Sequence, residues 1–309
     1  NLNPELPEDR HIMLRRLRIW LLHHARTQEI TLACLHDFER AADGSAIWNY
    51  HVPTGNGLYV DISMKIEIVA GKNQTRITFL RKEGAGRDYL APGSAVKLIV
   101  RPDVEDRNFH YSTKASGLEN VWPGKVRFLE RGFDFTPAPE RTLSLQTSSG
   151  KFVPGAEWSY MIWQPNEADR GLDPHSDTYS PGYFDIDLDD CGSAQISASI
   201  QTPMEPEKLQ PVKPSAADFR AAEDSGIETN MLAAMRAFVV KRGELKTVIA
   251  GYPWFLDWGR DTLIAARGLI AAPEFRGNVK AILRQFAQFA EHGTIPNIIH
   301  GSTVGNRDT

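Results

Sequence analysis

The densest group of chemically active side chains lies in one short stretch of the sequence. Residues 250–262 read Ala-Gly-Tyr-Pro-Trp-Phe-Leu-Asp-Trp-Gly-Arg-Asp-Thr, so four aromatic rings, two carboxylates and a guanidinium fall within thirteen residues. Aromatic rings are rigid apolar surfaces against which the C–H face of a sugar ring can pack. Carboxylates and guanidinium groups form paired hydrogen bonds with hydroxyls. The stretch therefore predicts a carbohydrate-binding site.

Gly259 supports the sugar site, because a tight turn there would let Arg260 and Asp261 project into the same cavity. Two structural interpretations stay open beside this one. Alternatively, Asp261 caps the apolar helix that follows it, or Asp257 and Arg260 form a local ion pair. Composition alone does not separate these possibilities.

The overall composition excludes several classes of protein. Thirty-five Lys and Arg residues against 39 Asp and Glu residues leave a net charge of −4, so the charge balance gives no indication of a nucleic-acid partner. No apolar run reaches the roughly 20 residues needed to cross a bilayer, so no membrane partner is expected. Cys34 and Cys191 lack metal-ligand spacing and favour a reducing, cytoplasmic setting. No residue pattern predicts a metal ion or a cofactor.

Residues 1–202 are typical of antiparallel sheet. Apolar and polar residues alternate without a break over 60–68, which puts every aliphatic side chain of that stretch on one face. The same alternation over 185–200, interrupted by turn residues 190–193, predicts a hairpin. Basic residues interleaved with leucines over 10–26 predict a strand with an exposed cationic edge rather than a helix on a membrane surface. Many short strands without helices between them indicate a β-sandwich.

The pattern changes after a proline-rich stretch. Four prolines within residues 203–215 predict a semi-rigid linker. In residues 216–309 the period becomes helical: Ile227, Met231, Met235 and Phe238 share one face, and an apolar stripe runs from Phe275 to Phe289. This segment has room for at most about five helices. We therefore expect residues 216–309 to be the incomplete beginning of an α-helical domain.

Several tracts of the sequence resemble one enzyme family. The run from Gly251 through Trp258-Gly259-Arg260-Asp261-Thr262 resembles the amylo-α-1,6-glucosidase domain of bacterial and archaeal glycogen debranching enzymes. Further similar tracts are 101–102 with 107–110, where Asn108 replaces an acid, then 170–173, 179–184, 295–297 and 306–309. The resemblance covers nearly the whole chain, with the weakest match in the first hundred residues. It implies a β-sandwich followed by the first helices of an (α/α)6 toroid.

The resemblance also implies a reaction and a set of site residues. The family hydrolyses α-1,6-linked glucose in branched α-glucans with inversion, which needs a carboxylic acid and a carboxylate base. The Trp-Gly-Arg-Asp run is also similar to the Trp-Thr-Arg-Asp run of glucoamylases, in which the Arg-Asp pair grips glucose hydroxyls. We therefore expect both catalytic carboxylates beyond Thr309, with Asp261 as the fallback acid. The substrate-binding candidates are Trp254, Asp257, Trp258, Arg260, Asp261, Asn297 and Asn306.

The expected partners are an α-glucan substrate and the remainder of the toroid, carried by the same gene or by a nicked second chain. By itself the 309-residue chain is expected to be inactive. Two other functions remain open: another toroid glucosidase, of trehalase or glucosylglycerate type, and a non-catalytic module for carbohydrate binding or domain packing.

Overall fold

The chain divides into two compact units. The computed structural model describes residues 10–41, 43–84, 86–91, 93–109, 111–188, 192–201, 219, 226–251, 255–301 and 303–307. One unit, called here the sandwich unit, spans 12–223, and the other, the helical unit, combines 1–11 with 224–309. The proline-rich linker predicted at 203–215 lies outside the described residues.

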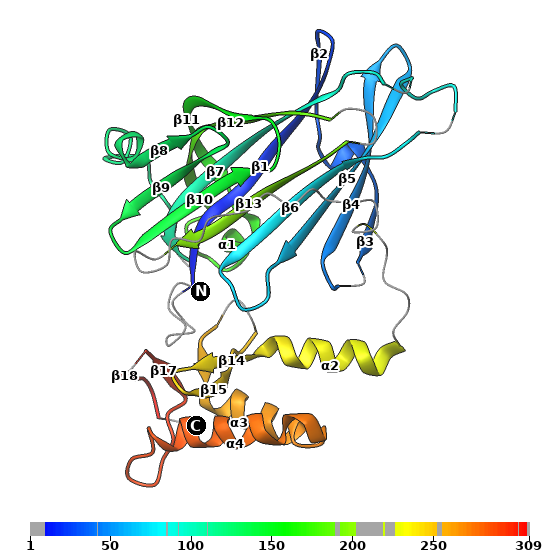
Figure 1. The fold of residues 1–309 in the computed structure, drawn as a ribbon. Helices are drawn as coiled ribbons and strands as arrows, with labels where there is room; N and C mark the ends of the chain where they lie inside the picture. The colour runs from blue at the N-terminus through cyan, green and yellow to red at the C-terminus, as the bar shows by residue number, and fades with distance from the viewer. Residues whose placement is uncertain are drawn as a thin grey trace. The chain divides into compact units, whose positions relative to one another are not determined.

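Two antiparallel sheets form the sandwich unit (Figure 1). The smaller sheet has the spatial order β11 (Lys151–Trp163), β12 (His175–Asp187), β7 (Lys97–Asn108), β1 (His11–His23) and β2 (Arg26–Glu29). The larger sheet has the order β3 (Leu35–Arg40), β4 (Ala46–Gly55), β5 (Leu58–Ile68), β6 (Gln74–Arg81), β13 (Ser193–Gln201), β10 (Arg141–Thr147), β9 (Gly132–Ala138) and β8 (Val126–Leu129). Short helices lie between strands: η1 (Leu32–Cys34), η2 (Trp122–Lys125) and α1 (Pro165–Asp169).

One apolar core fills the space between the two sheets. Val60, Ile62 and Met64 of β5 are buried in it, as the alternation over 60–68 predicts. The smaller sheet contributes residues such as Val100 of β7 to the same core. The central strands, such as β5 and β7, therefore have an apolar inner face and an outer face that is free for polar side chains.

The hairpin predicted over 185–200 does not form. β12 pairs with β11 and β7 in the smaller sheet, whereas β13 pairs with β10 and β6 in the larger one. The two strands thus belong to opposite layers. Alternating burial is the same whether the next strand pairs beside the first or crosses to the facing sheet, so the pattern could not distinguish these topologies.

The cationic strand is not an exposed edge. β1 lies between β7 and β2, and its outer face meets acidic residues of β7. Arg16 forms an ion pair with Asp103, and Arg18 binds the same carboxylate with an Nη2–Oδ1 distance of 2.8 Å. Beside them Glu105, which is fully buried, pairs with Arg107. The sequence showed the basic residues of β1 but not their acidic partners about 85 residues away.

Removing the carboxylate shared by Arg16 and Arg18 should destabilise the sandwich unit. Asp103→Ala leaves two guanidinium groups without their buried counter-charge, so we expect the free energy of unfolding to fall by about 3 kcal/mol. The measurement is chemical denaturation followed by intrinsic fluorescence. The matched control is Asp187→Ala, because Asp187 pairs with Lys97 but its side chain is 62% exposed. Equal unfolding midpoints for the two variants would show that the Asp103 pairs contribute nothing.

In the described residues, the helical unit has three α-helices with short strands between them. Its elements are α2 (Gly226–Phe238), β14 (Val239–Arg242), β15 (Leu245–Val248), β16 (Asp257–Trp258), α3 (Gly259–Leu269), η4 (Pro273–Phe275), α4 (Arg276–Ala287), β17 (Ile298–His300) and β18 (Thr303–Val304). None of the helices in the described ranges is both long and apolar enough to cross a membrane.

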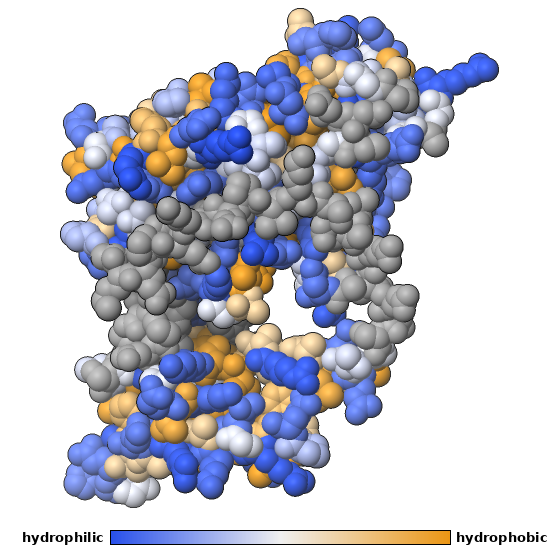
Figure 2. All heavy atoms as spheres, viewed as in Figure 1, coloured by the Kyte–Doolittle hydropathy of each residue, from blue (hydrophilic) through white to orange (hydrophobic). Residues whose placement is uncertain are grey.

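Most of the stripe predicted from Phe275 to Phe289 packs, although Leu283 is 48% exposed, whereas most of the stripe of α2 does not. Phe275, Val279, Ile282 and Phe286 are buried in the core of the helical unit. On α2, Ile227, Met231 and Phe238 are 80%, 58% and 41% exposed, and of the predicted stripe only Met235 packs against that core. Figure 2 shows apolar surface on this unit interspersed with polar surface.

Strands within the helical unit were not predicted. β14 and β15 form a hairpin in which Val239 is paired with Val248 and Arg242 with Leu245. At its turn Gly243 has a φ of +54°, a left-handed conformation that glycine adopts without strain. Valines on either side of a turn glycine were the available sequence signal for this hairpin.

Candidate functional site

The aromatic and charged stretch forms the junction between a short strand and a helix. β16 pairs with β17, so that Asp257 lies opposite Ile299 and Trp258 opposite Ile298. The helix α3 begins at the next residue, Gly259. Residues 252–254, including the candidate Trp254, lie outside the described part of the chain.

Gly259 is required because two backbone segments approach closely. Its N–H donates to the Asn297 carbonyl oxygen over 2.8 Å. A Cβ atom at this position would lie 2.1 Å from the Pro296 carbonyl oxygen. The glycine predicted for a tight turn is thus needed for a different reason: a side chain would push the 295–297 loop away from the start of α3.

Asp257 has a different place from the one expected of a sugar ligand. Its side chain is 0% exposed, and its Oδ2 atom lies 2.9 Å from Nη1 of Arg242, which is itself 4% exposed. Arg242 also donates to the carbonyl of Gly301 and lies over the ring of Phe289, 5.9 Å from its centre. An enclosed and paired carboxylate cannot reach a sugar, so Asp257 acts in holding the junction together. Nothing in the sequence indicates its partner, fifteen residues earlier on another strand.

Thr262 and Trp258 complete the framework of the junction. The buried hydroxyl of Thr262 donates to the Val248 carbonyl oxygen over 3.1 Å and ties α3 to β15. Trp258 is half-buried and meets Phe255 edge to face, with ring centres 6.0 Å apart. These contacts anchor the residues on either side of Arg260 and Asp261.

Arg260 and Asp261 remain free for other contacts. Both are exposed and occupy the second and third positions of α3. In the described ranges neither side chain has a hydrogen bond or an ion pair, so the structure shows no Asp257–Arg260 pair. Asp261 makes no side-chain cap, and the extended residue before α3 is Trp258. Both structural interpretations of the charged pair are therefore corrected.

The two free side chains do not share a cavity. Asp261 lines a hollow of about 610 Å³ together with Phe255, Val248 and Thr262. Arg260 lines a second hollow of about 490 Å³ together with Pro296 and other residues. Successive helix positions point about 100° apart, which separates neighbours that a tight turn could have aimed together. The expectation of one shared cavity was wrong because both residues are already helical.

The two candidate asparagines come together beside the start of α3. The N–H of Asn297 donates to the carbonyl oxygen of Asn306 over 2.8 Å, while the carbonyl of Asn297 accepts from Gly259. Asn297 is 9% exposed, and among the described residues its buried Oδ1 atom has no hydrogen-bond partner. The side chain of Asn306 is exposed. The fold thus brings a loop about forty residues away to the junction.

The arginines of the sandwich tract hold backbone rather than a ligand. Arg101 donates to the Gly155 carbonyl oxygen over 2.8 Å. Arg107 donates to the carbonyl oxygens of Phe109 and Tyr111 over 2.9 and 2.7 Å. Within the described ranges, no group of three His, Cys, Asp or Glu side chains could hold a metal ion.

Comparison with known families decides where the chain belongs. The family model described as glycogen debranching enzyme N terminal matches residues 1–195, and the model described as amylo-alpha-1,6-glucosidase matches residues 233–307. The first match alone covers more than half of the chain. The chain belongs to the glycogen debranching enzyme family. The second match contains the whole strand–helix junction, from Asp257 to Asn306.

A solved structure supports the fold. A bacterial glucoamylase, crystallised in complex with acarbose, aligns with a TM-score of 0.50 and 12% identity over 94% of this chain. This likeness confirms a β-sandwich followed by the first helices of an (α/α)6 toroid. The chain spans 47%, about half, of the glucoamylase chain. A search of the curated proteins finds no significant match.

Filling the position of Gly259 should destabilise the junction. Gly259→Ala forces a Cβ against the Pro296 carbonyl, so we expect the free energy of unfolding of the helical unit to fall by about 2 kcal/mol. Gly268→Ala on the same helix is the matched control, because its Cβ would meet nothing within 4 Å. That change should be neutral or slightly stabilising, since alanine favours helix over glycine. Hydrogen exchange of the α3 amides measures the change in stability of both variants. Equal protection in the two variants would contradict the close approach of Gly259 to Pro296.

Proposed function

We propose that the chain supplies part of the glucose-binding subsite of an inverting glycoside hydrolase that removes α-1,6-linked glucose from branched α-glucans. The observation that carries the proposal is the division of labour within the matched junction. Asp257, Gly259 and Thr262 make the contacts that hold the junction together. The side chains of Arg260 and Asp261, in contrast, are exposed and have no partners in the described ranges. A carboxylate and a guanidinium held on one rigid helical turn are suited to donating to and accepting from sugar hydroxyls.

Asp261 is better suited to binding than to completing the chemistry. Inversion needs two carboxyl groups roughly 6.5–9.5 Å apart. Of the described residues that line its hollow, Asp261 is the only carboxylate, and Asp257 is enclosed by Arg242. We therefore assign Asp261 to binding a hydroxyl of the terminal glucose and Arg260 to a sugar contact in the adjoining hollow, with the acid and base supplied by the remainder of the toroid. Asn297, whose Oδ1 atom lacks a described partner, is the next candidate ligand beside them.

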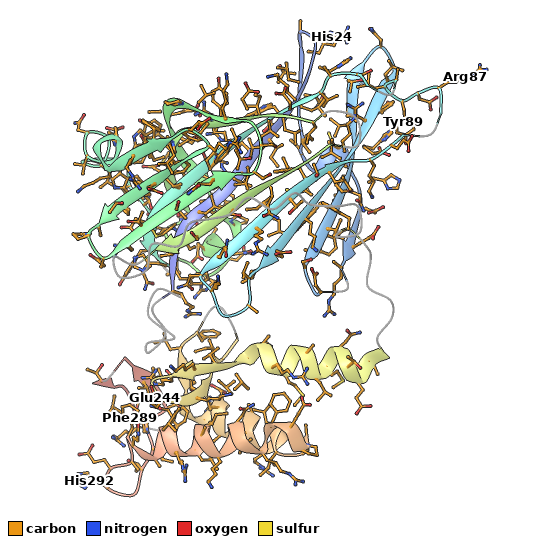
Figure 3. The ribbon with its side chains drawn as sticks, viewed as in Figure 1. His24, Arg87, Tyr89, Glu244, Phe289 and His292 are labelled. Carbon is orange, nitrogen blue, oxygen red and sulfur yellow. The ribbon has the colours of Figure 1, made fainter. Side chains whose placement is uncertain are left out.

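Asp261→Ala in the protein with its whole toroid should remove most activity without loss of folding. We expect kcat/KM on a phosphorylase limit dextrin to fall at least about a hundredfold, because a buried sugar hydroxyl loses a charged partner. Glu244→Ala is the matched control, since Glu244 is an exposed carboxylate at the β14–β15 turn (Figure 3). Wild-type turnover by the Asp261 variant, with unchanged thermal unfolding, would contradict the assignment of Asp261 to the glucose-binding subsite.

A second substrate separates binding by Asp261 from acid catalysis. α-Glucosyl fluoride has a leaving group that needs no proton, so a variant lacking only the general acid retains turnover of it. We expect Asp261→Ala to lose activity on the fluoride as well as on limit dextrin. Retained fluoride hydrolysis would instead identify Asp261 as the acid.

The reaction itself should release β-glucose from an α-1,6 branch. Proton NMR of the first product formed distinguishes inversion from retention before mutarotation mixes the anomers. Parallel rates on trehalose and glucosylglycerate test the alternative toroid glucosidases. Faster hydrolysis of either small glucoside would replace the debranching proposal, and binding without hydrolysis of any substrate would indicate a non-catalytic module.

A further inference from the structure

A further hollow, separate from the two beside α3, lies on the sandwich unit and has the chemistry of a ligand site. It has a volume of about 420 Å³, within the range of small-molecule sites, and lies where β3, β4 and β5 run side by side. Tyr50 of β4 and Ile62 of β5 face the core. Side chains alternate between the two faces of a strand, so the neighbouring residues Asn49, His51 and Asp61 project from the outer face of the sheet. The glycosidase junction uses none of these residues.

The floor of this hollow is a fixed polar network around Asn49, which is 8% exposed. Its amide nitrogen donates to Asp37 and to Glu39, and its oxygen accepts from Ser63 and from the ammonium of Lys82 at 2.9 Å. The hydrogen bond from Asn49 lowers the pKa of Asp37, so that carboxylate stays an ionised acceptor. An amide with all its positions engaged holds its neighbours in place before any ligand arrives.

His51 and Tyr89 line the wall, and Tyr59 supports His51 by stacking on it. His51 is stacked on Tyr59 with ring centres 4.2 Å apart and planes inclined by 12°, and its Nδ1 atom lies 2.7 Å from Oδ1 of Asp61. Tyr89 meets His51 edge on at 5.6 Å from the loop after β6 (Figure 3). That ring rests against Gly84, where a Cβ would lie 2.1 Å from it. The nearby carboxylate of Asp61 raises the pKa of Tyr89, which keeps its hydroxyl a hydrogen-bond donor.

The mixture of groups selects one class of ligand. The lining carboxylates Asp37 and Asp61, together with Glu39 behind Asn49, outnumber the one lining ammonium, Lys82, and disfavour an anion. They are already bonded to nitrogen donors, and the described residues contain no three-ligand metal cluster. An apolar ligand would leave the fixed polar groups without water or partners. A neutral ligand that both donates and accepts hydrogen bonds, and that has an apolar face for the rings, is what remains.

We propose that this hollow binds a segment of an α-glucan chain, as a second carbohydrate site distinct from the Arg260–Asp261 turn. The class of ligand follows from the hollow itself, whereas the choice of α-glucan rests on the proposed function. A second contact with the same polymer raises the effective concentration of its branches at the first site. Its removal should therefore weaken action on glycogen-sized substrates more than action on short oligosaccharides.

Histidine NMR of the whole chain tests the site directly. Maltoheptaose is titrated into protein carrying labelled imidazole carbons, with the His51 signal assigned by its loss in His51→Ala. We expect the His51 signal to shift saturably, while that of His24, an exposed histidine beyond β1, stays in place (Figure 3). Cellopentaose, with β-1,4 links, is the comparison ligand and should cause a smaller shift.

Two variants and a control connect the shift to the hollow. Tyr59→Ala removes the stacked ring and Asp61→Asn replaces an acceptor oxygen with a donor, so each should weaken maltoheptaose binding about tenfold. Tyr111→Ala, which truncates a tyrosine 72% exposed elsewhere on the unit, should leave binding unchanged. Either variant binding like wild type, with native unfolding, would overturn the site as drawn.

The remaining outcomes separate this inference from the proposed function. In Asp261→Ala the His51 shift should persist, because the two sites share no residue. If the shift disappears in Asp261→Ala but survives Tyr59→Ala, the hollow is not the binding site while the glycosidase proposal stands. If millimolar maltoheptaose moves no His51 signal, or cellopentaose moves it equally, the α-glucan site is overturned and the hydrolysis assays alone decide the enzyme.

Discussion

The enclosed ion pair between Arg242 and Asp257 is the constraint on which the helical unit depends. A carboxylate with no exposure to water is costly unless it is paired, so β14 must bring Arg242 to it. The same arginine binds the carbonyl of Gly301 and lies over Phe289. One charge pair thus joins a hairpin, the short strand β16 and the segments on either side of β17. Because α3 begins directly after β16, this pair also sets where the free charges of Arg260 and Asp261 stand.

Within thirteen residues the chain separates enclosed, paired side chains from exposed ones by the direction in which they point. The carboxylate of Asp257 points inward from a strand, and the hydroxyl of Thr262 points inward from a helix. Between them the first turn of α3 carries Arg260 and Asp261 outward. Two carboxylates that look equivalent in the sequence therefore have opposite surroundings: Asp257 is enclosed and paired with Arg242, and Asp261 is exposed.

The sandwich unit uses its two faces in a similar way. Apolar side chains meet between the sheets, while the outer faces carry polar networks that are themselves largely enclosed. On the smaller sheet the network is ionic, with Asp103 shared by Arg16 and Arg18. On the larger sheet it is centred on Asn49 and leaves a hollow beside the rings of His51 and Tyr59. The second arrangement borders the hollow of about 420 Å³.

The sequence alone determined where the main strands and helices lie, because periodicity acts within a few positions. It predicted the strand over 60–68 and most of the stripe from Phe275 to Phe289, but not the short strands of the helical unit. The Trp-Gly-Arg-Asp run, as a motif, carried the resemblance to the family. Contacts between distant residues were decided only by the tertiary structure: Asp257 with Arg242, Gly259 with Pro296, and β12 and β13 in opposite sheets. Periodicity says which face of an element is buried, but not which element covers it. Whether Asp257 is enclosed and Asp261 exposed depends on which element covers each face.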